Sequence, residues 1–172
     1  MTPDLIRLRT SLDELSESLS EIEFEYIDDP AWAEPSDTSY LNDIDRANPD
    51  IMDNVTAMTA TNRLIAWFGK DDEGFIGLWR SSAQLPIEGC QVVRLDSEGQ
   101  YSLVAATVPD YIAISVLESS FEATRDALIA AGFLVSPSRD AIWDAIKKQE
   151  EPNTFRNDLY NQGRIRRGLK AV

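Results

Sequence analysis

The sequence predicts an α+β fold: a single domain over residues 1–172 with a mainly antiparallel central sheet flanked by helices, a long N-terminal helix and a helical C-terminal third. Three observations support this prediction. The length of 172 residues suits one hydrophobic core. Short apolar runs bounded by turn residues fill the middle of the chain, and apolar residues at helical spacing lie before and after them. The predicted regions are an acidic helical region (1–62), the sheet (63–106), the C-terminal helices (107–163) and a basic tail (164–172).

A long first helix is predicted from its start signal and its apolar spacing. Thr2 and Pro3 are typical of a helix start, because threonine caps the first turn and proline fits the first helical position. The apolar residues that follow are spaced alternately three and four apart, which places them on one helical stripe. They are Leu5, Leu8, Leu12, Leu15, Leu19, Ile22 and Tyr26. This stripe either packs on the chain's own sheet or pairs with a second chain.

Closely spaced prolines interrupt regular structure after the first helix. Residues 28–48 are therefore expected to form a surface loop with short helical turns. Asn48 and Pro49 then resemble an N-cap followed by a first-turn proline, and they predict that another helix opens here. The apolar residues of this helix, which we expect to face the core, are Ile51, Met52, Val55 and Met58.

Four apolar runs predict four strands that pair as two consecutive β-hairpins. The runs are residues 64–68, 75–79, 92–95 and 101–105. In each hairpin the connector contains an acidic residue followed by glycine, Gly74 in the first and Gly99 in the second. Glycine at this place supplies the backbone conformation that a short hairpin loop commonly requires.

Start signals predict four helices in the C-terminal third. Each signal is a first-turn proline or a polar N-cap. Ser119 and Glu122 have the spacing of a capping box and mark the second helix. The first helix is expected to begin at Pro109, and the second to extend from about Phe121 to near Gly132. The third is expected to begin at Ser136–Pro137 and to end at a break at 150–152. The last is expected to begin at Asn153 or Thr154 and to end just before Gly163. The basic tail 164–172 either folds back on the acidic residues of the N-terminal third or lies free.

The residue types argue against an enzyme. The chain has no histidine, which excludes Ser-His-Asp and Cys-His catalysis and histidine-ligated zinc, and Cys90 is its only cysteine. The acidic hairpin connectors lack the ligand series of a calcium loop, so turn chemistry explains them better than metal binding. No glycine-rich phosphate loop is present. We therefore predict no catalytic residue, no cofactor and no metal, with a hydrolase that uses two carboxylates as the remaining enzymatic alternative.

The chain is strongly acidic, with 30 Asp and Glu residues against 16 Lys and Arg and a net charge of −14. This charge disfavours nucleic acid and anionic membranes as partners. Residues 11–62 hold 14 acidic residues and a single basic one, Arg46. They form either a solubilising face or a docking surface for a basic protein. No run of about 18 apolar residues and no export signal occurs, so a cytoplasmic location is expected.

The docking interpretation selects ten candidate contacts in the proline-rich segment and the helix after it. Eight are acidic, and two are aromatic residues of the kind that often anchors an interface. They are Asp28, Asp29, Trp32, Glu34, Asp37, Tyr40, Asp43, Asp45, Asp50 and Asp53.

The sheet region resembles the SUKH superfamily over about residues 49–118. The similarity lies in residues 67–79 (WFGKDDEGFIGLW), in Pro86 and in residues 92–99 (VVRLDSEG). In that family a helical segment precedes a strand, a turn with glycine and acidic residues, an aromatic-rich strand, a proline and a further hairpin, and helices follow. The resemblance implies a bacterial immunity protein that neutralises a toxin of the nuclease or deaminase class by direct binding. The alternative is a regulatory or scaffold module of the same fold, with a homodimer as one form.

Overall fold

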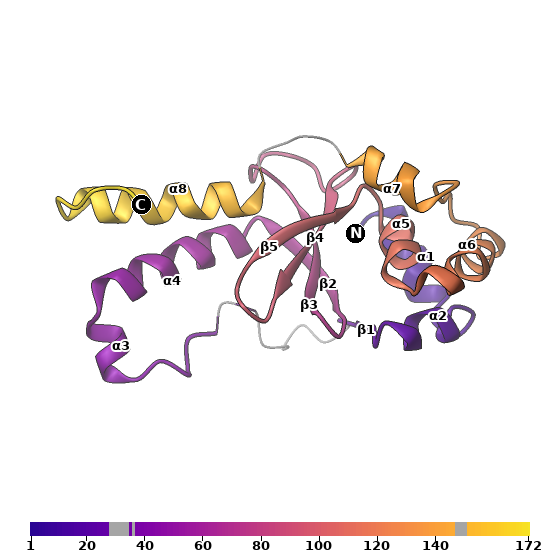
Figure 1. Ribbon diagram of the computed structural model, residues 1–172, viewed down its shortest axis with the longest axis horizontal. Coiled ribbons are helices and arrows are strands. Elements are labelled where there is room, and N and C mark those ends of the chain that lie inside the picture. Colours follow the sequence, from indigo (N-terminus) through magenta and orange to yellow (C-terminus); the bar gives the residue numbers. More distant parts are fainter. Residues whose placement is uncertain (28–34, 36, 147–150) are drawn as a thin grey trace.

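The computed structural model describes residues 1–27, 35, 37–146 and 151–172. They form an α+β fold around one antiparallel sheet, as predicted. Figure 1 shows this sheet in the middle of an elongated molecule, with a group of helices at one end and two long helices projecting from the other. Among the described residues, no helix combines the length and the apolar character that crossing a membrane requires.

The helices belong to two parts, which we call the helical lobe (residues 1–24 and 107–146) and the arm (residues 37–63 and 151–172). The lobe contains α1 (Pro3–Thr10), α2 (Ser16–Glu21), α5 (Val108–Ser115), the 3-10 helix η1 (Glu118–Ser120), α6 (Phe121–Ala130) and α7 (Arg139–Ala145). The arm contains α3 (Asp43–Ala47), α4 (Pro49–Asn62) and α8 (Pro152–Arg166).

The sheet confirms both predicted hairpins. Its strands lie in chain order and each pairs antiparallel with the next: β1 (Glu25–Tyr26), β2 (Ile65–Lys70), β3 (Gly74–Trp79), β4 (Gln91–Asp96) and β5 (Tyr101–Ala105). The second hairpin turns at Gly99, whose φ of 76° favours glycine. Asp71 and Asp96 each accept two backbone N–H groups of their turn at 2.8 to 3.0 Å. Turn chemistry therefore explains these acidic residues, as predicted.

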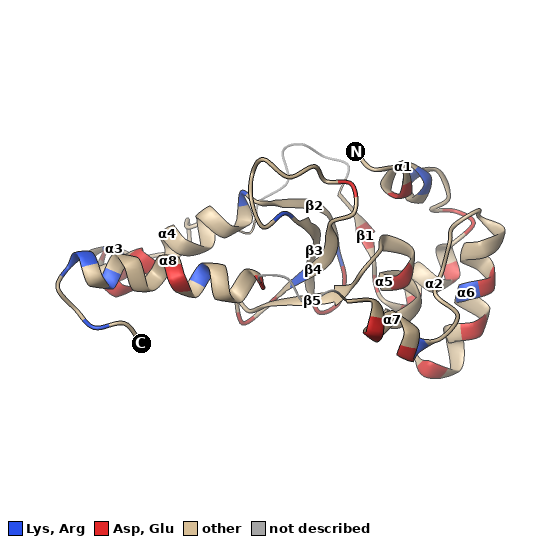
Figure 2. Cartoon of the chain, turned by 90° about the horizontal axis from the view of Figure 1, so that it is seen from above, with Lys and Arg blue, Asp and Glu red and all other residues tan. Residues whose placement is uncertain are grey.

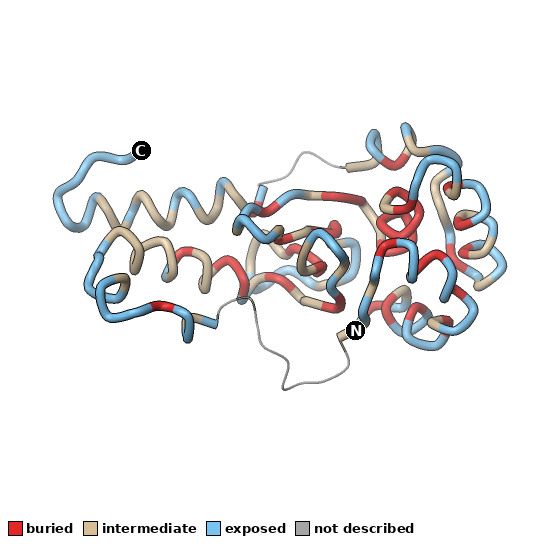
Figure 3. Tube along the Cα trace, turned by 60° about the horizontal axis from the view of Figure 1, so that its bottom comes forward, coloured by how far each residue is buried: buried red, intermediate tan, exposed pale blue. Residues whose placement is uncertain are grey.

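The two faces of the sheet pack against different parts of the chain, because alternate residues of a strand point to opposite faces. One face and the lobe enclose the main core, in which Leu8, Ile76 and Tyr111 are completely buried. The other face carries a smaller cluster where the arm joins the sheet, and there the Phe155 ring lies 5.7 Å from that of Trp79. In Figure 3 buried segments gather in the sheet and the lobe, whereas most of the arm is intermediate or exposed.

The prediction of one long N-terminal helix is wrong. α1 ends at Thr10, the chain turns at Ser11, and α2 begins only after this turn. Side chains such as those of Ser11 and Asp13 compete for backbone hydrogen bonds and so weaken a helix interior. Five residues of the apolar stripe are nevertheless buried in the main core: Leu5, Leu8, Leu15, Leu19 and Ile22. These five residues thus pack within the chain, and the other two members of the stripe, Leu12 and Tyr26, are half-buried.

In the arm, the start of α4 agrees with the sequence prediction and the end of α8 does not. Asn48 caps α4 and Pro49 occupies its first position, as expected. The prediction that the last helix ends before Gly163 is wrong, because α8 continues through this residue. A Cβ atom at Gly163 would lie 2.6 Å from Cγ of Asp53 on α4. Glycine at this position therefore allows α4 and α8 to approach closely instead of ending a helix.

The other C-terminal helices follow the predicted order, although their starts differ in detail. α5 begins one residue earlier than expected and is capped by Thr107. α6 starts at Phe121 as predicted, but η1 precedes it and the expected capping box contributes no side-chain hydrogen bond. α7 is capped by Ser138 instead of Ser136, and α8 starts with Pro152 at its first position.

Candidate functional site

The described acidic residues of segment 11–62 lie in two parts of the molecule, the lobe and the arm. Four of the ten candidates fall outside the described residues: Asp28, Asp29, Trp32 and Glu34. The other six lie on or next to α3 and α4 of the arm: Asp37, Tyr40, Asp43, Asp45, Asp50 and Asp53. Acidic residues 13–23 belong instead to the lobe, on the other side of the sheet (Figure 1). The described acidic residues of segment 11–62 therefore do not form a single surface.

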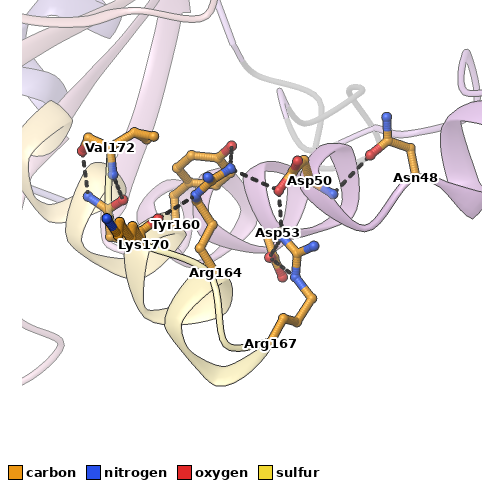
Figure 4. A network of polar contacts seen from close by, with 9 residues as sticks. Asn48, Asp50, Asp53, Tyr160, Arg164, Arg167, Lys170 and Val172 are labelled. Carbon is orange, nitrogen blue, oxygen red and sulfur yellow. Dashed lines mark hydrogen bonds and ion pairs between the residues drawn. The ribbon is translucent and has the colours of Figure 1, made fainter.

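Asp50 and Asp53 are already paired within the chain. Nη1 of Arg164 lies 3.1 Å from Oδ1 of Asp50, and Nε of Arg167 donates to Oδ2 of Asp53 at 2.9 Å (Figure 4). Arg167 also bonds to Asp50, and this hydrogen bond lowers the pKa of the Asp50 carboxyl. At these positions the basic tail does fold back on the acidic segment. We therefore leave both carboxylates out of the surface proposed below.

Of the other arm candidates, Asp37, Tyr40 and Asp43 are exposed and Asp45 is half-buried. Asp37 and Asp45 serve local turns. Asp37 accepts hydrogen bonds from the N–H and the hydroxyl of Ser39, both at 2.8 Å, and these bonds lower the pKa of Asp37. Asp45 accepts the backbone N–H at the N-cap of α3 in a capping box. Asp43 and Tyr40 face solvent, and 75% of Tyr40 is exposed.

Most of the excess negative charge lies on the helical lobe. The lobe, residues 1–24 and 107–146, has 12 Asp and Glu residues against four Arg, a net charge of −8. The arm, residues 37–63 and 151–172, has seven of each sign. In Figure 2 acidic segments recur on α2, α6 and α7 at one end of the molecule, and the basic segments of α8 lie at the other end. The fold thus joins two acidic segments that are far apart in sequence.

Arginines of the lobe are held by contacts within it. Arg139 donates to the carbonyl oxygens of Ile114 and Val116, both at 3.0 Å, and so satisfies groups at the end of α5. The guanidinium of Arg7 lies over the ring of Phe133, 5.6 Å from its centre. These cations are thereby engaged by the lobe's own carbonyls and rings.

One groove of the lobe, with a volume of about 230 Å³, lies between α2 and α6. Acidic side chains come from the α2 side and small ones from the α6 side: Glu14, Glu17 and Glu21 against Ser120, Ala123 and Ala127. A buried hydrogen bond of 3.0 Å between the hydroxyls of Ser18 and Thr124 holds the two helices together. The groove therefore combines a row of carboxylates with a rigid, uncharged opposite wall.

A second groove, of about 430 Å³, adjoins the first at Glu21, which lines both. The carboxylate of Glu21 accepts the backbone N–H of Leu117 at 2.8 Å. Asp72 and Glu73 reach this groove from the β2–β3 turn, and the internally engaged Arg94 and Arg139 also line it. Two exposed apolar residues line it too, Leu117 at 68% and Trp143 at 53% exposure. Apolar anchors beside carboxylates suit a protein surface that carries apolar and basic groups. We call the two grooves together the acidic groove.

A buried ion-pair network holds the β2–β3 turn at the edge of the acidic groove. The Asp71 side chain is fully buried, and its Oδ2 lies 2.6 Å from Nη2 of Arg94 and 2.8 Å from the Tyr111 hydroxyl, which donates to it. Arg94 also pairs with Glu73. Burial alone would lower the pKa of Arg94, but Asp71 and Glu73 outweigh it and raise this pKa. The network therefore fixes the turn that carries Asp72 and Glu73.

Tyr101 and Tyr111 are expected to stay protonated until the protein unfolds at high pH. Burial raises the pKa of both phenols, and the charge of Asp71 raises that of Tyr111 further. Because an unfolded phenol ionises at about pH 10, their contribution to stability is complete below that pH and declines above it. Phenolate absorbance should show an ionisation step that coincides with the loss of near-ultraviolet circular dichroism. A Tyr101→Phe, Tyr111→Phe double variant should lack this step, and an unchanged titration would contradict the assignment.

Within the described ranges, no group of three or more Cys, Asp and Glu side chains is placed to hold a metal ion. The acidic groove offers carboxylates, an exposed indole and small side chains. These groups can attract a basic partner and pack against its apolar side chains.

The acidic segment 11–62 contains only part of the acidic groove. Glu14, Glu17 and Glu21 belong to this segment, whereas Leu117 and Trp143 lie outside every predicted site. For Trp143 a usable signal was present, because the helical spacing around it placed this large aromatic near the edge of the buried stripe. No pattern in the sequence indicated that it would lie near α2.

Comparisons of the chain with protein-family models, with curated proteins and with solved structures gave no match. The resemblance of residues 49–118 to the SUKH superfamily therefore depends on the motifs quoted above.

Proposed function

We propose that this chain is a non-enzymatic immunity protein that binds and neutralises a basic bacterial toxin, of the nuclease or deaminase class, through the acidic groove. One observation carries the proposal: a groove with an exposed tryptophan, Trp143, lies on a lobe whose net charge is −8. The partner surface that fits it is positively charged and contains at least one apolar side chain.

Charge and apolar contact have separate roles in this interaction. The negative field of the lobe attracts a basic partner and speeds association, and this effect weakens as salt rises. Leu117 and Trp143 provide the apolar contact, because large side chains near the centre of an interface contribute most of its binding energy. A stable complex of standard size buries about 800 Å² on each partner, which requires contacts beyond the groove itself.

The immunity role is supported by the resemblance to the SUKH superfamily and by the chemistry of its toxins. A protein that acts on nucleic acid commonly has a basic surface, because its substrate is a polyanion. An acidic inhibitor can cover that surface and at the same time block the substrate. A regulatory or scaffold module of the same fold would use the same groove but would bind without neutralising.

The test is co-expression with the toxin encoded beside this chain's gene, followed by growth measurement and co-purification. The groove variant carries Glu14→Gln, Glu17→Gln and Asp72→Asn, which are exposed carboxylates of the acidic groove. A matched arm variant removes the same charge through Asp43→Asn, Glu151→Gln and Asp158→Asn. Three exposed ion pairs of about 0.5 kcal/mol each correspond to about a tenfold loss of affinity. We expect this loss, mainly as slower association, in the groove variant alone.

The outcomes separate the hypotheses. Absence of both growth rescue and co-purification would overturn the immunity proposal. Co-purification without rescue would favour the regulatory or scaffold module. Equal losses in the groove and arm variants would mean that the partner does not select the acidic groove.

A further inference from the structure

Helix α8 carries three asparagines at intervals of four residues: Asn153, Asn157 and Asn161. Residues four apart lie on the same face of a helix, so these side chains form a row along the arm. We call them the asparagine row. The side-chain amides of Asn153 and Asn161 each form two hydrogen bonds with the backbone of one residue, and that of Asn157 does not.

Asn153 binds the first residue of β5, the strand at the edge of the sheet. Its Oδ1 accepts the N–H of Tyr101 at 3.1 Å, and its Nδ2 donates to the Tyr101 carbonyl at 2.6 Å. Asn161 does the same with Val172, at 3.0 Å for the accepted N–H and 3.2 Å for the donated bond. Both bonds are drawn at Val172 in Figure 4. Each amide thus supplies the acceptor and the donor that a neighbouring strand would supply.

Asn157 lies between these two and contacts no backbone outside its helix among the described residues. It is exposed, its Oδ1 accepts Nη2 of Arg156 at 2.9 Å, and its Nδ2 has no partner within the part of the chain that the structure describes. The residue lines a groove of about 650 Å³ between α4 and α8, which also reaches the β4–β5 turn and Val172. The groove is large enough for several residues of a peptide.

Asn157 is the one member of the row at which a further backbone segment can bind. Asn153 and Asn161 are already engaged by Tyr101 and Val172. An extended segment that crosses α8 at Asn157 meets this single amide, and it can present its N–H and C=O groups as Tyr101 and Val172 do to the neighbouring amides.

We propose that Asn157 binds the backbone of an extended peptide segment of a partner protein, which lies in the groove between α4 and α8. Ile51 and Tyr160 line this groove and suit an apolar side chain of the peptide. Glu98 at the β4–β5 turn forms no ion pair with described residues and favours a basic side chain of the peptide. Arg156 lines the same groove, and its Nη1 donates to the Gly99 carbonyl. This site is separate from the acidic groove and does not rest on the proposed immunity function.

The test uses a fluorescein-labelled peptide with the sequence Ser-Lys-Val-Lys-Val-Lys-Ser and the full chain, at physiological ionic strength. Fluorescence anisotropy compares the wild type with Asn157→Ala and with Gln162→Ala, an exposed amide on the same helix. Loss of two neutral hydrogen bonds should weaken binding about tenfold in Asn157→Ala and leave Gln162→Ala unchanged. The same peptide with N-methylated valines, which lacks those N–H donors, should also bind about tenfold more weakly.

A Glu17→Gln variant tests whether the peptide binds at the acidic groove instead, because weaker binding by this variant would place the peptide there. The proposal is overturned if the wild type shows no saturable binding at peptide concentrations up to about 1 mM, which corresponds to a very weak complex. It is also overturned if Asn157→Ala and Gln162→Ala bind alike, if the methylated peptide binds as well as the original, or if only Glu17→Gln weakens binding. In the last case the acidic groove remains a site while the asparagine row does not.

Discussion

Replacement of Asp71 by alanine is expected to lower the free energy of unfolding by about 3–5 kcal/mol, the range seen when one partner of a buried ion pair is removed. The Asp71 side chain is fully buried and contacts both Nη2 of Arg94 and the hydroxyl of Tyr111. It also accepts the backbone N–H groups of Glu73 and Gly74. The substitution would therefore leave a half-buried guanidinium short of its main counter-ion and remove the acceptor of the turn.

Urea denaturation followed by circular dichroism measures this change. Asp72→Ala is the matched control, because Asp72 lies in the same turn and is exposed. We expect it to change stability by less than about 0.5 kcal/mol, as is usual for surface substitutions. Similar midpoints for the two variants would show that the network with Arg94 does not stabilise the fold.

Replacement of Gly74 by alanine is expected to cost at least about 3 kcal/mol, at the upper end of the cost of overpacking. A Cβ atom at this position would lie 2.1 Å from the carbonyl oxygen of Leu95 and 2.9 Å from its carbonyl carbon. Both atoms belong to the backbone of β4, which is paired with β3 along its length. No flexible side chain can move aside, so the strands would have to separate at this end.

Gly89→Ala is the control for Gly74→Ala. Gly89 has a φ of 78°, but nothing lies within 4 Å of a Cβ atom placed there. Its replacement should cost only the backbone strain of a left-handed residue, about 1 kcal/mol. Thermal unfolding of the two variants gives the comparison, and an equal loss would mean that the approach of Leu95 to Gly74 is not the main constraint.

The parts of the fold that the sequence predicted correctly depend on short-range chemistry. Both hairpins follow from apolar runs and their turn residues, and the start of α4 follows from the polar cap Asn48 and the proline after it. Each of these signals involves residues within a few positions of one another. Such signals need no distant contact to act, although context can override them, as at the capping-box spacing of Ser119 and Glu122.

The wrong predictions concern places where packing chooses between two local outcomes. The stripe from Leu5 to Ile22 is compatible with one helix or with two, and its buried residues pack in the main core from two helices. Gly163 can end a helix or let two helices approach, and α4 is close enough at Asp53 for the second. For Gly163 the deciding neighbour, Asp53, is distant in the sequence.

The candidate site shows the same division. The composition established that the chain is acidic and lacks histidine, and the order of its residues established that the carboxylates are clustered. Neither could establish which carboxylates act together, because a field depends on distances in space. Asp50 and Asp53 are not available to a partner, because they pair with Arg164 and Arg167. These arginines lie more than a hundred residues further along the chain. Glu21, Asp72 and Trp143 gain a common groove only because the lobe and the sheet fold against each other, and this packing of remote segments is absent from any local pattern.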